Sequence, residues 1–235
     1  MSVSHKIHYI YQRLAVIMPL LFSPAAFASS DGPAIIDRWV AESEAFSFFE
    51  LSYQGLSYDE ATDVTSVSGL KAVFTSELMS PGPDGEDALG VSYAFEAPTL
   101  RYTGLTENSS RYLAELIVAE EVSFSLSVDD GSGELPAGET RGSYIGMVVR
   151  GAEWAKQPDI VNDPKKPISK CYPIFAALAD VNVGSLAIAG AQSAQQLDED
   201  TLLISEYGPM VVGEVKASNL SSVSVDGVTI RTAAR

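Results

Sequence analysis

Apolar and polar residues alternate along much of the chain after position 46. In the clearest run, Val122, Phe124 and Leu126 are separated by single serines. Side chains of a strand point alternately to its two faces, so this run predicts a strand with one buried and one wet face. The same alternation predicts strands in three further segments, at residues 49–53, 70–74 and 91–95.

Stretches rich in turn-forming residues separate these segments, at positions 58–63, 80–85 and 129–134. Near the C-terminus, Asp226-Gly227 lies between two short apolar runs and predicts a tight turn or a bulge. Serine-alternating strands with such connections favour an antiparallel arrangement. We therefore expect a mainly β fold, built as a curved sheet or as a sandwich.

Short sequence elements recur along the chain. Tyr53-Gln-Gly55-Leu56 reappears as Tyr102-Thr-Gly104-Leu105. One interpretation is a sheet of weakly repeated strand pairs. The alternative is coincidence, because a chain rich in serine and valine produces matches of this length.

A different pattern precedes the strands. Pro33 is followed by Ile35, Ile36 and Trp39, which share one side of a helix over residues 34–43. We expect this helix, within an N-terminal segment at 29–45, to cover a β-rich domain at 46–235.

The first residues have the features of a secretory signal. Lys6 and Arg13 are the only charged residues before an apolar run, and Ala-Phe-Ala follows at 26–28. Signal peptides have this order, which places the cleavage before Ser29. The apolar run is shorter than the ~20 residues that span a bilayer, and no later run is long enough. We expect residues 1–28 to be removed on export, leaving no transmembrane segment.

Charge and length bound the remaining function classes. The 28 signal residues hold two of the 15 basic residues and none of the 31 acidic ones. Such an acidic protein repels phosphate backbones, so we expect no nucleic-acid partner. The 207 remaining residues suffice for one domain with a sizeable core.

Histidine and cysteine usage limits the chemistry further. Both histidines, His5 and His8, lie in the signal, and Cys171 is the only cysteine. This excludes His-dependent catalysis and His-ligated metals in the exported protein. A paired-carboxylate hydrolase, a Ser-Lys nucleophile and an oxygen-ligated calcium site remain, but none stands in a recognisable motif. We expect no enzyme, no cofactor and no metal.

Residues 154–173 hold four prolines and four lysines, and we expect a long loop there because proline removes ladder donors. The lysines are Lys156, Lys165, Lys166 and Lys170. They are the candidate binding residues, for an anionic headgroup or an acidic partner. The alternative is that they only solubilise the loop or pair with nearby carboxylates.

The rhythm Tyr-x-Gly-Leu-x-Tyr-Asp-x-x-Thr at 53–62, followed by Val67-Ser-Gly-Leu70, resembles exported bacterial β-repeat proteins of the Gram-negative envelope, the AsmA-like and TamB-like proteins. The likeness covers residues 46–130 and 179–230. It implies an open, curved sheet whose inner apolar face shelters lipid or another apolar ligand, and it supplies no site residues. This chain differs from that group in being short and in having no predicted membrane anchor.

Our first hypothesis is therefore a non-enzymatic periplasmic protein that binds a lipid-like ligand or an envelope protein. It requires more apolar side chains on the sheet than a closed core needs. The alternatives are a secreted structural or adhesive module, with an extracellular location, and a carboxylate-based hydrolase. The hydrolase requires two acids facing each other across a cleft.

Overall fold

The sheet dominates the computed structural model, which describes residues 32–44, 49–79, 88–129, 138–156, 181–197, 200–216 and 219–234. One helix, α2 (Gly32–Ser43), precedes the strands within these ranges. The strands are β1 (Phe49–Ser52), β2 (Gly55–Asp59), β3 (Val64–Met79), β4 (Ala88–Thr103), β5 (Thr106–Glu107), β6 (Arg111–Asp129), β7 (Gly138–Ala155), β8 (Val181–Ile188), β9 (Gly190–Gln196), β10 (Thr201–Tyr207), β11 (Met210–Val212), β12 (Val215–Lys216), β13 (Asn219–Leu220), β14 (Val223–Val225) and β15 (Val228–Ala234).

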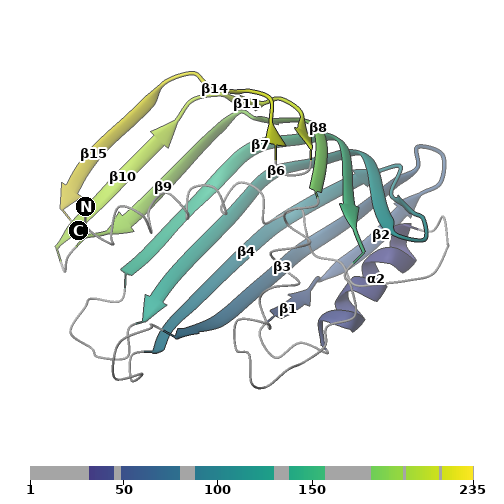
Figure 1. Ribbon diagram of the computed structural model, residues 1–235, viewed down its shortest axis with the longest axis horizontal. Coiled ribbons are helices and arrows are strands. Elements are labelled where there is room, and N and C mark those ends of the chain that lie inside the picture. Colours follow the sequence, from purple (N-terminus) through teal and green to yellow (C-terminus); the bar gives the residue numbers. More distant parts are fainter. Residues whose placement is uncertain are drawn as a thin grey trace.

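All strands belong to one antiparallel sheet in which chain neighbours lie side by side (Figure 1). Several short strands follow one another along a single line. β8 and β9 both pair with β7, while β12, β11 and β10 pair with β8 and β9. The last line, β13 to β15, pairs with β12, β11 and β10. The prediction of a mainly β, antiparallel fold is confirmed. Of the two predicted arrangements, a curved sheet and a sandwich, the structure has the first, as a single open sheet.

A line of backbone kinks crosses the sheet from edge to edge. Gly69, Gly146 and Gly227 have φ values of 58°, 63° and 86° on three different strand lines. Only glycine adopts this left-handed region without strain. The pairing register continues unchanged through each kink: Tyr207 pairs with Val228 and Met210 with Val225. We call this line the first crease.

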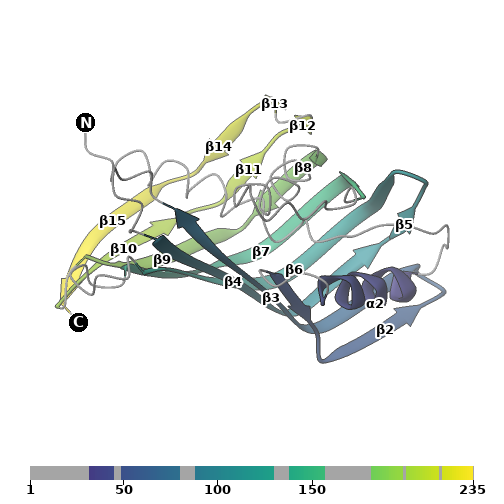
Figure 2. The ribbon, with the colours of Figure 1, turned by 60° about the horizontal axis from the view of Figure 1, so that its bottom comes forward.

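A second crease runs five or six residues away along most strands. Gly104 and Gly151 have φ values of 61° and 60°. Gly184 lies beside Gly151, and a Cβ at Gly184 would lie 3.1 Å from the carbonyl oxygen of Arg150. The two creases therefore bend a sheet of long strands into a curved shape, which Figure 2 shows from another side.

Each kink shifts the alternation of side chains by one residue. The buried residues of β6 show the resulting steps of two and three positions: Tyr112, Ala114, Ile117, Ala119 and Val122. The three-residue steps fall at the two creases. Apolar residues consequently stay on one face, which we call the inner face, along the whole strand.

Helix α2 packs on this inner face at the β1–β3 end of the sheet (Figure 2). Ile35, Ile36 and Trp39, the residues of the predicted apolar stripe, are all buried. The expected helix at 34–43 is therefore present and begins two residues earlier. No helix among the described residues is long and apolar enough to cross a bilayer.

The structure changes two of the predictions made from the sequence. Trp154 and Ala155, placed in the Pro/Lys-rich loop, belong to β7, because the Trp154 ring packs in the core. The Asp226-Gly227 pair is a kink within the last strand line with equal numbers of residues on the two paired strands, so it is neither the predicted tight turn nor the predicted bulge.

Candidate functional site

Four aromatic rings fill the space between α2 and the sheet. Trp39 makes edge-to-face contacts with Tyr102, Tyr112 and Trp154, at centroid distances of 6.1, 5.5 and 5.8 Å. The helix supplies the central ring, and β4, β6 and β7 supply the other three. Such contacts stabilise beyond the burial of their area, so this end of the inner face is closed by a rigid aromatic cluster.

A buried ionic network lies next to that cluster. The Glu107 side chain has no exposed surface, and its carboxylate lies 2.8 Å from Arg38 Nη1 and 2.9 Å from Lys156 Nζ. Lys156 Nζ also lies 5.1 Å from the centre of the Tyr112 ring. The network joins α2, β5 and the end of β7. Its three residues lie far apart in the sequence, so no local motif could predict the network.

Electrostatics keep the Glu107 carboxylate charged. Burial alone raises the pKa of Glu107, but the hydrogen bonds and positive charges of Arg38 and Lys156 outweigh it, and the pKa lies below its usual value. A buried ion pair is retained only where each charge has close partners. The network therefore fastens the helix to the sheet.

Of the four lysines predicted as binding residues, Lys156 alone lies among the described residues. Lys156 is buried and paired with Glu107, as in the alternative in which lysines pair with carboxylates. Lys165, Lys166 and Lys170 lie outside the described residues, as do Cys171 and residues 157–180. Binding of an anionic group by these three lysines stays a prediction.

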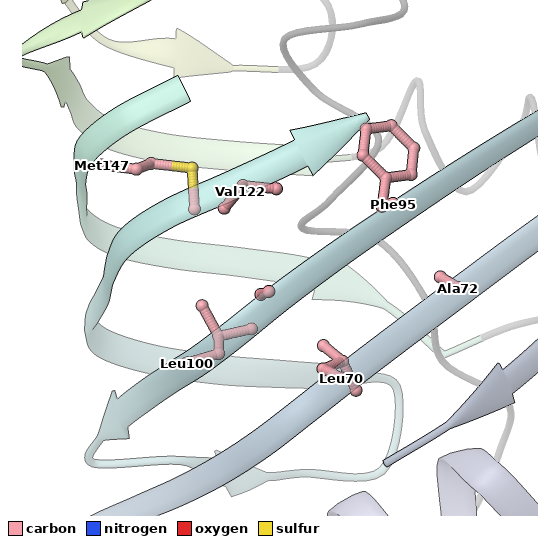
Figure 3. Close-up of a pocket in the computed structure, with 7 residues that line it drawn as sticks. Leu70, Ala72, Phe95, Leu100, Val122 and Met147 are labelled. Carbon is pink, nitrogen blue, oxygen red and sulfur yellow. The ribbon is translucent and has the colours of Figure 1, made fainter. Parts of the chain in front are cut away.

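A depression lined by apolar side chains lies on the inner face, in the middle of the sheet (Figure 3). It is small: the space in it that water-sized molecules can occupy is about 20 Å³, and the depression is open to solvent. Strands β3, β4, β6 and β7 contribute the described lining residues, which are Leu70, Ala72, Phe95, Ala97, Leu100, Val122 and Met147.

The first crease explains why space is left at this place. Leu70 and Ala97 lie on one side of the kink, while Leu100 and Met147 lie on the other. At the kink the inner-face side chains are three residues apart rather than two, and alanines occupy two of the neighbouring positions. The two rows of inner-face side chains are therefore separated at the crease, and no aromatic ring of the described lining fills the space between them.

A second aromatic group borders the depression. Tyr93 contacts the ring of Phe95 at 4.3 Å between centroids, and Phe124 stacks on Tyr144 at 5.2 Å. Burial, together with the neighbouring Tyr144, raises the pKa of Tyr93 well above its usual value. The Tyr93 hydroxyl is buried and has no hydrogen-bond partner among the described residues. An unpaired buried hydroxyl is costly, so this group is a candidate polar contact for a ligand.

The inner face continues to the C-terminal edge of the sheet, where its apolar residues are exposed. Val212, which is buried, pairs with Val223, which is 52% exposed, and paired residues share a face. By the same registers, five exposed apolar residues of the last strand line point inward: Leu220, Val223, Val225, Val228 and Ile230. We call residues 220–230 the C-terminal strip.

The chemistry available on the inner face is that of apolar contact. The described lining of the depression contains no carboxylate, and no group of three or more metal-ligating side chains occurs within the described ranges. Leu70, Ala72, Phe95 and Val122 were predicted only as strand positions, and the other lining residues lie outside the predicted strands. The three-residue step in the spacing of apolar residues, which marks each crease, is the sequence signal that points to this place.

Comparisons of the chain with family models, with curated proteins and with solved structures find no significant match.

Proposed function

We propose that this protein is a non-enzymatic, exported binding protein of the bacterial periplasm, and that its inner face holds a lipid-like ligand. One observation carries the proposal: a depression lined by aliphatic, phenylalanine and methionine side chains lies on the same face as a row of exposed valines and an isoleucine. Apolar surface of this kind marks binding sites more often than it occurs without a function.

The lining favours an apolar ligand group. Ala72 and Ala97 are small beside Phe95, and the hollow that they leave is open to solvent. The resemblance to AsmA-like and TamB-like envelope proteins supports the same ligand class, since it implies a curved sheet with a sheltered apolar face. In this proposal an acyl chain lies along the inner face and across the depression rather than enclosed within it.

The Tyr93 hydroxyl supplies polar selectivity in this proposal. The Tyr93 ring contacts the ring of Phe95, a lining residue of the depression, at 4.3 Å between centroids. A ligand oxygen that reached the hydroxyl would satisfy a donor that has no partner among the described residues. The ligand class is therefore amphipathic, with one oxygen-bearing group next to an apolar chain.

The lining also ranks the alternatives. A carboxylate-based hydrolase needs two acids across a cleft, and the described lining of the depression has none. A structural or adhesive module with flat polar faces needs no apolar depression. An envelope protein as ligand remains compatible with the same face, because a partner's apolar residues can fill the same space.

Ligand occupancy is tested first by native mass spectrometry, with lipid extraction, on protein purified from its own envelope fraction. We expect an adduct whose mass matches an extracted acyl lipid. Binding to purified protein is then measured with N-phenyl-1-naphthylamine, whose fluorescence rises in apolar sites, and with its displacement by palmitate. Absence of both an adduct and probe binding would refute the proposal.

A pair of variants on one strand locates the site. Ala97→Phe fills the depression and should weaken probe binding at least tenfold. Ala94→Phe makes the same change on the outer face of β4, where Ala94 pairs with Val73 and Ser125, and should leave binding unchanged. Met147→Ala enlarges the site and should retain binding, which separates loss of the site from loss of folding. Equal effects of the two phenylalanine variants would place the probe elsewhere.

A further inference from the structure

The two edges of the sheet have different neighbours. At the first edge, α2 contacts β1, β2 and β3. At the other edge, β13, β14 and β15 each pair on one side only within the described part of the chain. Alternate residues of an edge strand direct their N–H and C=O groups away from the sheet, where they can pair with another strand.

Natural sheets usually protect such an edge with charges, prolines or short strands. The segment 219–234 contains no proline and no lysine, and its only charged residues are Asp226 and Arg231. These two cancel, so the segment 219–234, which includes the C-terminal strip, has no net charge on a chain of net charge −16. Repulsion between two copies of this acidic chain is therefore weakest at the C-terminal strip.

The strip is also symmetric about its own kink. The inward-facing residues Val223 and Val225 precede Asp226-Gly227, and Val228 and Ile230 follow it. An antiparallel second copy centred on the kink places Val225 opposite Val228 and Val223 opposite Ile230. Because the kink shifts the alternation by one residue, all of these side chains face inward in both copies.

The same register suits the remaining positions. It places Ser224 opposite Thr229 on the outer face and Ser222 opposite Arg231, so no like charges lie directly opposite each other, and the two Asp226 residues are diagonal neighbours at the two-fold axis. The two Gly227 residues meet Asp226 at the centre, and a Cβ added at Gly227 would have no atom within 4 Å. The kink therefore leaves open space where two backbones must approach each other.

We propose that this protein forms a two-fold symmetric dimer in which residues 222–231 of two copies pair as antiparallel strands, joining two sheets into one. The first crease then continues from one subunit into the other, and both inner faces lie on the same side. Cross-strand contacts among Val223, Val225, Val228 and Ile230 cover side chains that are 38–62% exposed in the single chain.

The mass of the purified protein tests the association. Light scattering after size exclusion should give twice the chain mass for wild type, and the monomer mass for Ile230→Lys. Val211→Lys is the matched control, because Val211 is 51% exposed on the neighbouring β11 and faces outward. It should remain dimeric, and far-UV circular dichroism should be native for both variants. A monomeric wild type, or equal loss of the dimer in both variants, overturns the proposal.

Cysteine pairing tests the register. In a Cys171→Ser background, Val225→Cys and Val228→Cys are oxidised separately and as a mixture. The mixture should form disulfide-linked dimers at least tenfold faster than either variant alone, since only residues 225 and 228 of opposite subunits face each other. A dimer linked equally well in one variant alone has another register, which contradicts the symmetric pairing.

Discussion

The two ends of the inner face are built from similar strands but are finished differently. At the N-terminal end, Trp39 of α2 is buried among rings of the sheet, and Glu107, whose side chain has no exposed surface, pairs with Arg38 and Lys156. At the C-terminal end, Ile230 and Val228 are 62% and 54% exposed. Alternating apolar residues therefore build a strand in both places, but they form a core only where another element covers them.

The largest loss of stability is expected from removing an aromatic ring at the covered end. Trp39→Ala removes the centre of the aromatic cluster and should lower the free energy of unfolding by about 3–5 kcal/mol. Ile230→Ala at the exposed end should change it by less than about 0.5 kcal/mol in the monomer. Urea unfolding followed by circular dichroism measures both. A similar loss for the two variants would mean that Ile230 is already covered.

Charge removal at the covered end should cost nearly as much. Glu107→Gln removes the carboxylate that pairs with the buried Lys156 and with Arg38, and loss of one partner of such a network costs about 3 kcal/mol. The exposed pair of Arg231 and Glu206 provides the control, and Glu206→Gln should cost less than about 1 kcal/mol. Comparable losses would show that the Glu107 network is hydrated.

The same carboxylate predicts a pH dependence. The pKa of Glu107 is lower in the folded protein than in the unfolded chain, where it is about 4.3. Its contribution is therefore complete above that range and is lost as the pH falls toward the folded pKa. Wild type should lose stability on acidification more steeply than Glu107→Gln, so the two unfolding curves should converge at low pH. Parallel curves would contradict this assignment.

Two glycines of the first crease should differ in the same direction, with a smaller difference in stability. A Cβ at Gly146 would lie 2.8 Å from the Ala189 Cβ, whereas a Cβ at Gly227 meets no atom within 4 Å. Both residues have positive φ, so alanine costs about 1–2 kcal/mol at either place. Gly146→Ala should cost more than Gly227→Ala by the added clash, as thermal unfolding would show. The reverse order would place a neighbour beside Gly227.

The smallest expected effect is at Tyr93. Tyr93→Phe removes a buried hydroxyl that has no partner among the described residues, so stability should stay within about 1 kcal/mol or rise. Displacement of the fluorescent probe by palmitate should weaken, while displacement by an alkane of equal length should not change. Unchanged palmitate displacement would remove Tyr93 from the proposed site.

Much of the fold follows from local patterns in the sequence. Alternation at 122–128 predicted part of β6, and the stripe of Ile35, Ile36 and Trp39 predicted α2, because these signals depend on neighbouring residues alone. The choice of one sheet over a sandwich depends on how distant strands pair. Local periodicity does not contain that information.

The candidate site was less predictable for a physical reason. Lys156 was predicted as a candidate binding residue in a long loop, because the end of β7 could not be located within a proline-rich segment. Its partners Arg38 and Glu107 are 118 and 49 residues away in sequence, and only the sheet brings them together. The depression depends on Ala72 and Ala97, whose small size matters only beside the crease.

The creases have a further consequence for how the strands find their partners. A long strand of simple alternation can slip by two residues and still bury the same face. Between β6 and β7, Ala119 pairs with Met147 and Glu121 with Ile145, so the three-residue step of β6 from Ala119 to Val122 lies opposite the kink at Gly146. Any slip would move the glycine kinks of β7 away from the three-residue steps of β6 and misalign both creases. The kinks thus act as alignment marks that reject mispaired hairpins during folding, whatever the length of the connections between strands.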